Sequence, residues 1–324
     1  MAPGTDFFLA VNYPWLIYGA DFGRSPWGHN GVSLQSAGAA VTADFAAIRS
    51  SGVSVVRWFL LCDGRSGIRY ENEIPAGPDE FLLADVGAAL DIASQSNLRI
   101  CFSLFDFLWL QSPERTAAAT NLPLAGRNTL QFAGGREALL QRILIPLFYE
   151  FRAHPGLFAW EIVNEPEWAI PEFQRSRKAT LPLADARAFF AEIADAIHQQ
   201  SAEAPVTLGS ARLQWVRAWS EIGLDHLQAH YYPQLERNQP LAQQLADVAN
   251  LAQPLWIGEL PANDPASPDY SIAGALTACR DAGLSGAGIW RWRPPEPGGS
   301  DVAFGSVQPE ILSAWRSQAR KFRV

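Results

Sequence analysis

The sequence predicts a single (β/α)8 barrel over residues 1–324, and three observations favour this fold class. Short apolar runs recur along the whole chain, each followed by a turn signal and a segment of helical periodicity. The runs are continuously apolar rather than alternating, as in parallel strands covered by helices on both faces. No linker, repeat or low-complexity stretch divides the chain, so eight β-then-α units form one domain.

Each expected strand is a short run rich in β-branched and aromatic residues. A doubly wound open sheet would also use such strands, but no G-x-G-x-x-G motif follows the first of them. The eight expected strands are LIYGADFG at 16–23, VSVVRWF at 53–59, LRICFSLFDF at 98–107, LFAWEIVNE at 157–165, APVTLGS at 204–210, HLQAHYYP at 226–233, LWIGELP at 255–261 and GAGIWRWR at 286–293.

Four segments between or after these runs have clear helical periodicity. The longer connections are expected to be βα loops that build the rim of a site at one end of the barrel. The expected helices span 79–96, 136–153, 185–200 and 309–322, and the expected rim loops span roughly 22–40, 62–78, 110–133 and 166–184.

The composition is that of an ordinary globular protein, since 48% of the 324 residues are hydrophobic and 18% are charged. The formal net charge is −8 and the basic residues are scattered singly. This argues against a nucleic-acid partner, because phosphate binding needs clustered Lys and Arg side chains. The 12 Trp, 7 Tyr and 18 Phe residues exceed what one core requires, and an uncharged or weakly charged ligand fits this balance best.

Cys62, Cys101 and Cys279 have no paired spacing and no partnering His cluster, so we expect buried thiols rather than disulfides or a zinc site. Neither a metal nor an organic cofactor is expected. No stretch approaches the ~18 apolar residues of a membrane span, and residues 1–15 have no basic segment that begins a signal peptide. We expect a soluble monomer without a membrane partner, cytoplasmic as given or secreted if a signal peptide was removed.

Functional groups of a parallel barrel lie at the C-terminal ends of its strands. Two glutamates, Glu165 and Glu259, end otherwise apolar runs. A carboxyl group at the lip of an apolar run is partly desolvated, which raises its pKa and suits a general acid. The other strand-end candidates are Asp21, Arg57, Asp106, Asn164, Ser210, His230, Tyr232, Trp290 and Trp292.

Five segments lie in order along the predicted strands: VVRWF at 55–59, WEIVNEP at 160–166, AHYYP at 229–233, WIGEL at 256–260 and GIWRW at 288–292. They resemble the strand-2 Arg, the strand-4 Asn-Glu pair, the strand-6 His-x-Tyr, the strand-7 nucleophile and the strand-8 Trp of the clan-A retaining glycoside hydrolases. The combination is most similar to glycoside hydrolase family 5, the cellulase and mannanase family, and covers most of the chain from 55 to 292.

The resemblance implies a retaining β-glycosidase that hydrolyses a β-glycan, of β-glucan or β-mannan type, by double displacement. It makes Glu165 the acid/base and Glu259 the nucleophile, two groups that must lie about 5–5.5 Å apart around the anomeric carbon. It also implies that Asn164 donates to the sugar 2-hydroxyl and that Trp290 is the platform under the reacting sugar.

Chemistry adds further members to the site. An ionised nucleophile needs positive charge or hydrogen-bond donors nearby, and Arg57 and Tyr232 are the strand-end residues that supply them. His230 precedes Tyr232 by two residues, so its side chain points to the same side of the strand, into the site. Asp106 ends strand 3, where family 5 often supplies a His, and is a further candidate for sugar binding.

Three other glutamates are not expected to react. Glu161 lies four residues before the acid/base position, roughly 13 Å down the strand, too deep to reach a substrate at the rim. We expect it to pair inside the barrel with an Arg such as Arg57 or Arg291. Glu167 and Glu172 fall in the following loop and are expected to be solvated.

The tryptophans divide by position. Trp160, Trp256 and Trp315 lie within a strand or a helix and are expected in the core, and Trp215 and Trp219 are expected to form a packing pair. The remaining ones that we assign lie at strand ends or in the loops after them, where aromatic rings stack on apolar sugar faces. They are Trp27, Trp58, Trp109, Trp168, Trp290 and Trp292.

Three alternatives stay open. A phosphate-binding barrel enzyme would use PPEPGGS at 294–300 beside Arg291 and Arg293, although no partner glycine motif follows strand 7. A non-catalytic carbohydrate-binding barrel would keep the aromatic cleft, although both carboxylates are present. A transglycosylase would use the same covalent intermediate. The partner is an oligosaccharide or polysaccharide, and neither its sugar nor endo or exo action follows from the sequence.

Overall fold

Eight parallel strands form the centre of the molecule. A computed structural model describes residues 7–112, 128–201, 203–236, 239–264 and 266–293. Its barrel strands are β1 (Phe8–Asn12), β4 (Val55–Phe59), β7 (Arg99–Asp106), β8 (Leu157–Asn164), β9 (Val206–Ser210), β10 (Leu227–His230), β11 (Leu255–Pro261) and β12 (Gly286–Trp290). They close into one barrel in the order β1-β12-β11-β10-β9-β8-β7-β4. The predicted (β/α)8 fold is confirmed.

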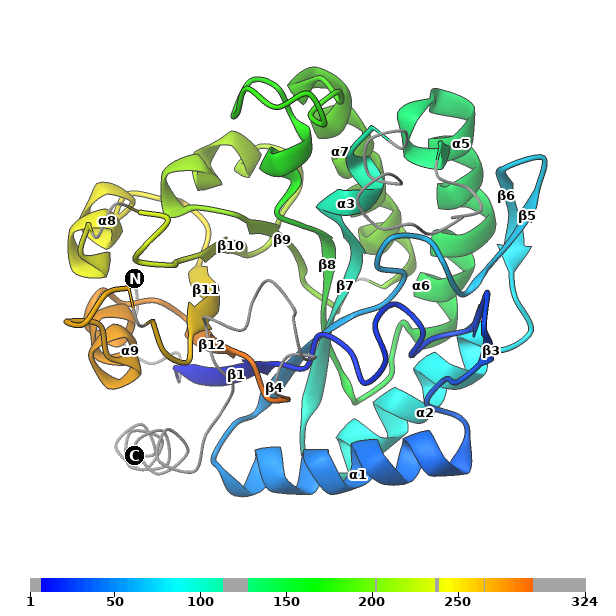
Figure 1. Cartoon of the computed structure of the whole chain (residues 1–324), viewed down its shortest axis with the longest axis horizontal. Helices are drawn as coiled ribbons and strands as arrows, with labels where there is room; N and C mark the ends of the chain where they lie inside the picture. The colour runs from blue at the N-terminus through cyan, green and yellow to red at the C-terminus, as the bar shows by residue number, and fades with distance from the viewer. Residues whose placement is uncertain (1–6, 113–127, 202, 237–238, 265, 294–324) are drawn as a thin grey trace.

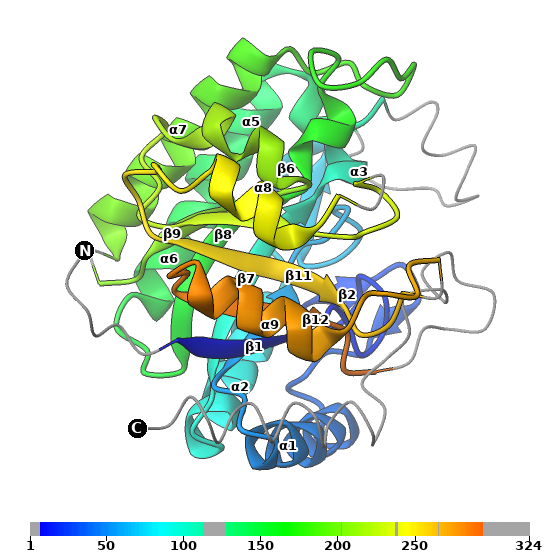
Figure 2. The same cartoon turned by 90° about the vertical axis from the view of Figure 1, so that its left-hand side faces the viewer.

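Helices follow the strands and lie around the outside of the barrel (Figures 1 and 2). The helices predicted over 79–96, 136–153 and 185–200 are confirmed, and 309–322 lies outside the described residues. The second of them contains a π turn, η2 (Leu140–Leu144), just before Pro146, which has no N–H to donate. The helices are α1 (Gln35–Ser50), α2 (Leu82–Gln95), α3 (Phe107–Leu110), α5 (Ala133–Leu139), α6 (Ile145–Phe151), α7 (Leu183–Gln200), α8 (Leu241–Asp247) and α9 (Ile272–Asp281), with 3-10 turns η1 (Thr129–Gln131), η3 (Pro166–Ala169) and η4 (Leu213–Trp219).

Two hairpins extend the loops at the C-terminal mouth of the barrel. Strands β2 (Arg24–Ser25) and β3 (Gly28–His29) pair antiparallel in the loop after β1. Strands β5 (Ile68–Glu71) and β6 (Ile74–Pro78) pair in the same way after β4. They lie in the predicted rim loops 22–40 and 62–78.

The expectation of a first strand at 16–23 is wrong. The strand is β1, and residues 16–23 form turns in the loop that follows it. Asp21 therefore does not end a strand. Its carboxylate accepts hydrogen bonds from the backbone N–H of Leu16 at 2.6 Å and of Ile17 at 2.7 Å, and from Trp58 Nε1 at 2.8 Å. These bonds fold the loop, which explains why an apolar run here is not a strand.

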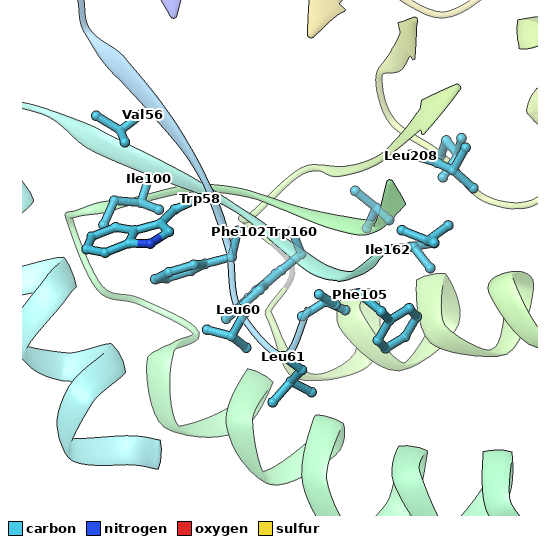
Figure 3. Close-up of a cluster of buried hydrophobic side chains, with 14 of the residues drawn as sticks. Val56, Trp58, Leu60, Leu61, Ile100, Phe102, Phe105, Trp160, Ile162 and Leu208 are labelled. Atoms are coloured by element: carbon cyan, nitrogen blue, oxygen red, sulfur yellow. The ribbon is translucent and has the colours of Figure 1, made fainter. Parts of the chain in front are cut away.

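Side chains alternate between the inside and the outside of the barrel along each strand. On β4, Val55 packs inside the barrel, and Val56 and Trp58 pack outside it. Figure 3 shows Trp58, Phe102 and Trp160 between the strands and the surrounding helices, where most of the apolar core lies. The lower interior of the barrel is also apolar and is formed by Ala10, Val55, Cys101, Phe158, Ala159 and Trp256.

The three cysteines are free and buried, as predicted. Within the described ranges, no helix is long and apolar enough to cross a membrane. The upper interior of the barrel, toward the C-terminal ends of the strands, is polar, and the candidate site is built there.

Candidate active site

Arg57 lies at the centre of the upper barrel and is fully buried. Its guanidinium donates to both oxygens of Glu161, at 2.5 and 2.6 Å, which confirms the pairing predicted for that carboxylate. It also donates to Asn12 Oδ1 at 2.8 Å, Asn164 Oδ1 at 2.7 Å and Glu259 Oε1 at 2.6 Å. Five bonds to four residues on three strands, β1, β8 and β11, hold the cation in one place, because every guanidinium N–H has a fixed direction.

Glycines at two strand positions leave the room that this network needs. A Cβ on Gly209 would come within 2.8 Å of Glu161 Oε1, and one on Gly258 would come within 2.3 Å of Gln228 Nε2. Gln228 in turn donates to Glu161 Oε2 at 3.0 Å. Although burial opposes ionisation, the Arg57 guanidinium holds the pKa of Glu161 below its usual range. Glu161 therefore serves as the permanent counter-charge of Arg57.

Glu259 lies near the end of β11, where the pairing with β12 shifts register between Ile257 and Leu260. Such an irregularity re-aims a side chain at the rim of a barrel. Glu259 Oε2 accepts from the Tyr232 hydroxyl at 2.6 Å, and its Oε1 from Arg57 at 2.6 Å. Burial raises the pKa of Glu259, while the Arg57 guanidinium and the Tyr232 hydroxyl favour its charged form.

Glu165 follows β8 with left-handed backbone angles, φ 49° and ψ 47°. Trp168 Nε1 donates to its Oε2 at 2.7 Å, and His230 Nδ1 lies 2.8 Å from its Oε1. Burial raises the pKa of Glu165 to about 7. The Trp168 hydrogen bond and the more distant Arg57 charge act in the opposite direction and lower this pKa. At neutral pH, a large fraction of this carboxyl group therefore carries a proton.

His230 connects the two glutamates. Its Nδ1 lies 2.8 Å from Glu165 Oε1 and 3.6 Å from Glu259 Oε1. Burial lowers the pKa of His230 to about 4, so the imidazole is neutral at pH 7. Gln228 Nε2 lies 3.4 Å from Nε2 of the ring. Because an amide nitrogen only donates, ring Nε2 is the acceptor, and the proton of the neutral imidazole lies on Nδ1, directed at Glu165.

The two carboxyl groups face each other across the mouth of the barrel. One oxygen of Glu165, one of Glu259 and a His230 nitrogen all lie within 4.8 Å of one another, a spacing that could hold a metal ion. However, the Arg57 guanidinium is a fixed positive charge 2.6 Å from Glu259, and a second cation there would be repelled. The arrangement fits proton transfer and nucleophilic attack better than metal binding.

Asn164 and Asp106 form the side of the site at the ends of β7 and β8. Asn164 Nδ2 donates to Asp106 Oδ2 at 2.8 Å, and Asp106 Oδ1 accepts from the Leu108 N–H at 2.9 Å. Burial raises the pKa of Asp106 to about 7. Asp106 thus orients the Asn164 amide, and the sequence did not indicate this role for Asp106.

An aromatic group lines the opposite side. Trp290 and Tyr232 share an apolar cluster with Phe59 and Cys62, and Trp15 and Tyr18 pack against it. The ring centroids of Trp290 and Trp15 are 6.4 Å apart. Trp27 lies elsewhere, 60% exposed in the β2–β3 turn, where the Arg65 guanidinium is 5.7 Å from its ring.

Several predicted positions are corrected. Trp58 and Trp109 are buried in the core rather than open to a sugar. Glu167 is fully buried and accepts three hydrogen bonds, so it is not solvated, whereas Glu172 is exposed as expected. Trp160 and Trp256 are in the core as expected. Trp315 and the PPEPGGS segment lie outside the described residues.

The expected packing pair of Trp215 and Trp219 is only indirect. Both rings contact Phe173, but Trp215 also meets Trp168 at 5.5 Å, and the Arg212 guanidinium lies 5.0 Å from the Trp215 ring. Trp215 therefore belongs to the surroundings of Glu165.

Sequence reasoning missed four polar or aromatic residues of the site. Asn12, which binds Arg57, was missed because β1 was placed too late in the chain. Gln228 was overlooked although it precedes His230 by two residues and so faces the same way. Trp15 and Tyr18 follow β1 and could have been found once that strand was placed correctly.

No protein-family model matches the chain. In sequence, the chain is similar to the mannan endo-1,4-β-mannosidase of Cryptopygus antarcticus, with 24% identity over 235 residues covering 67% of this chain and 55% of the relative. It is 27% identical to that of Mytilus edulis over 165 residues, covering 51% of this chain and 41% of the relative. The chain thus spans about half the length of the curated relatives it matches.

Solved structures share the fold over nearly the whole chain. The β-mannanase of the blue mussel Mytilus edulis has a TM-score of 0.73 at 20% identity, covering 97% of this chain and 92% of that one. The endo-1,4-β-mannanase of Eisenia fetida has a TM-score of 0.72 at 21% identity, covering 98% and 91%. The chain is therefore similar in sequence to endo-1,4-β-mannosidases and shares the (β/α)8 fold of solved β-mannanases, and the predicted resemblance to clan-A glycoside hydrolases of family 5 is confirmed.

Proposed function

We propose that the chain is a retaining endo-β-1,4-mannanase that hydrolyses a β-mannan by double displacement. The observation that carries the proposal is the pair Glu165 and Glu259, with carboxyl oxygens within 4.8 Å of each other. Retaining enzymes separate their carboxyl groups by about 5–5.5 Å, whereas inverting ones leave about 6.5–9.5 Å for a water molecule. The names of the relatives support mannan as the substrate.

In the first step, Glu259 attacks the anomeric carbon and Glu165 gives its proton to the glycosidic oxygen. The glycosidic bond breaks, and the sugar stays bound to Glu259 as an ester. Arg57 and Tyr232 contact the nucleophile and supply the charge and the donor that keep it ionised. The raised pKa of Glu165 suits a proton donor near pH 7.

In the second step, the ionised Glu165 takes a proton from water while the water oxygen attacks the anomeric carbon. The bond to Glu259 breaks, and the product keeps the β configuration because the carbon has been inverted twice. His230 is neutral and its Nδ1 is directed at Glu165. Its charge therefore stays the same whether Glu165 is protonated or ionised.

Binding of the sugar is assigned to two sides of the site. Asn164 uses one amide hydrogen for Asp106, and an amide nitrogen carries two, so the other is left for the sugar 2-hydroxyl. The aromatic cluster with Trp290 and Trp15 offers apolar surface to the sugar rings. We expect the chain to act as a monomer on a polysaccharide.

Product analysis tests the function directly. The chain should release short oligosaccharides from β-1,4-mannan, and NMR at early times should detect the β-anomer first. β-Glucan, xylan and aryl β-glycosides serve as comparison substrates. Initial α-anomer would contradict the retaining mechanism, and cleavage of β-glucan alone would contradict mannan as the substrate. Mannose as the sole early product would contradict endo action.

A further inference from the structure

The carboxyl group of Glu167 is fully buried behind the candidate site. Three donors converge on it: Ser210 Oγ at 2.6 Å and Trp219 Nε1 at 2.7 Å bind Oε1, and the Ala211 N–H at 3.0 Å binds Oε2. All three donors are uncharged, and they belong to the end of β9, the residue after it and η4. One carboxyl group thus ties the loop after β8 to the next βα unit.

Burying a carboxyl group is costly unless its hydrogen bonds are made. Burial raises the pKa of Glu167, and the Ser210, Ala211 and Trp219 bonds oppose that rise. Such bonds are directional, so they define one position of the loop more sharply than apolar packing does. The reaction proposed above uses no atom of Glu167, which leaves its buried, fully engaged carboxyl group to be explained.

The loop that Glu167 anchors carries the proton donor. Glu165 adopts left-handed angles, which are uncommon for a residue other than glycine and persist only where the surroundings enforce them. Its N–H donates to Gly209 O at 2.7 Å, and its own carbonyl accepts from the Trp168 N–H at 3.1 Å. The Trp168 indole then donates to the Glu165 carboxyl group at 2.7 Å. Glu167 lies between these two residues, inside η3.

We propose that Glu167 is a positioning residue: its three bonds fix the turn η3, and this turn holds Trp168 against the carboxyl group of Glu165 for proton transfer. The inference rests on the proposed role of Glu165 as acid/base. It assigns to Glu167 no contact with the substrate and no proton transfer of its own.

The variant Glu167→Gln tests the proposal. The amide oxygen still accepts from Ser210 and Trp219, but its NH2 group opposes the Ala211 N–H and loosens the turn. We expect kcat/KM on β-1,4-mannan to fall roughly tenfold or more, while kcat/KM on 2,4-dinitrophenyl β-mannobioside, whose leaving group needs no acid, changes less than about threefold. The basic limb of the mannan pH profile should move upward, because the Trp168 bond favours ionised Glu165.

Two further variants separate positioning from general stability. Glu172→Gln changes an exposed glutamate in the same loop and should leave both substrates unaffected. The double variant Glu167→Gln/Trp168→Phe should lose no more than Trp168→Phe alone, because both changes break one chain of contacts. Additive losses would overturn the proposal that Glu167 acts through Trp168.

A loss of equal size on both substrates, or no loss on either, would also overturn the proposal. If Glu167→Gln does not fold, Ser210→Ala and Trp219→Phe each remove one donor and must show the same selectivity for the poor leaving group. If the wild-type chain cleaves none of these substrates, the proposed function fails, and a 13C NMR titration still tests the positioning. The pKa of the Glu165 carboxyl group should then be higher in Glu167→Gln than in the wild type, and an unchanged pKa would contradict the inference.

Discussion

The two carboxyl groups at the mouth of the barrel are both desolvated, but their neighbours differ. Glu259 lies against the Arg57 guanidinium and the Tyr232 hydroxyl, each at 2.6 Å. Glu165 has an indole and a neutral imidazole instead, Trp168 at 2.7 Å and His230 at 2.8 Å. Burial raises the pKa of both groups.

We infer that charge placement, rather than burial, distinguishes the proposed nucleophile Glu259 from the proposed acid/base Glu165. A fixed cation favours the ionised form of Glu259, which a nucleophile needs. Among the described residues, no cation lies in hydrogen-bond contact with Glu165, and burial raises its pKa to about 7, which suits a proton donor. Substitutions of Glu259, Glu165, Tyr232 and Asp106 test these assignments.

Removal of the proposed nucleophile should have the largest effect. Glu259→Ala is expected to lower kcat on β-mannan by about 10⁴-fold or more, because no covalent intermediate forms. With a 2,4-dinitrophenyl β-mannoside as donor, azide should attack from the α face that Glu259 vacates, displace dinitrophenolate and give the α-mannosyl azide. Appreciable residual turnover of mannan, measured by reducing-end release, would mean that another group attacks.

Removal of the proposed acid/base should affect poor leaving groups selectively. Glu165→Ala is expected to lower kcat/KM on mannan by about 10²–10⁴-fold, while kcat/KM on a dinitrophenyl mannoside stays near the wild-type value. Added azide should raise kcat and give the β-mannosyl azide, since Glu259 still forms the intermediate. Equal losses on both substrates would contradict the assignment of Glu165.

Tyr232→Phe removes one donor from Glu259 and leaves Arg57 in place. Transition-state stabilisation should fall by about 1.5–3 kcal/mol, the usual size for a hydrogen bond to a charged group. The pKa of Glu259 should rise, because the lost bond favoured its charged form. The acidic limb of the kcat/KM profile should therefore move to higher pH, and a shift of the basic limb alone would show that Tyr232 serves the other carboxyl group.

Asp106→Asn should have the smallest effect on turnover, about 0.5–1.5 kcal/mol, since an Asn oxygen can still accept from Asn164.

The effect of Asp106→Asn on stability depends on pH. Burial raises the pKa of Asp106 from 3.8 to about 7, so the stability that its protonated form contributes is present below pH 4 and is lost as the pH rises toward 7. The melting temperature of Asp106→Asn relative to wild type should increase from pH 4 to pH 8, and a constant difference would contradict the raised pKa.

The sequence predicted the barrel and most of its strands, because a buried parallel strand is a continuous apolar run between turn signals. The first strand was placed wrongly. FLAVN at 8–12 is short, whereas LIYGADFG at 16–23 is longer and also contains several apolar residues. Only the bonds of Asp21 to the backbone and to Trp58 reveal it as a loop. Loop structure of this kind depends on partners from other strands, which no local pattern encodes.

Within the site, strand alternation could have been applied further than it was. Since Arg57 faces inward, its neighbour Trp58 must face the helices, so its assignment as a sugar platform was avoidable. The burial of Glu167 is a different case. Its partners come from β9 and η4, more than forty positions along the chain, and a glutamate in a loop is ordinarily solvated.

Trapping of the covalent intermediate tests the central division of roles most directly. The wild-type chain would be incubated with a 2-deoxy-2-fluoro-β-mannobioside carrying an activated leaving group, digested, and mapped by mass spectrometry. We expect one fluoro-mannobiosyl label per chain, on Glu259, that is lost slowly as activity returns. A label on Glu165 or on another residue, or unimpeded activity without any label, would contradict it.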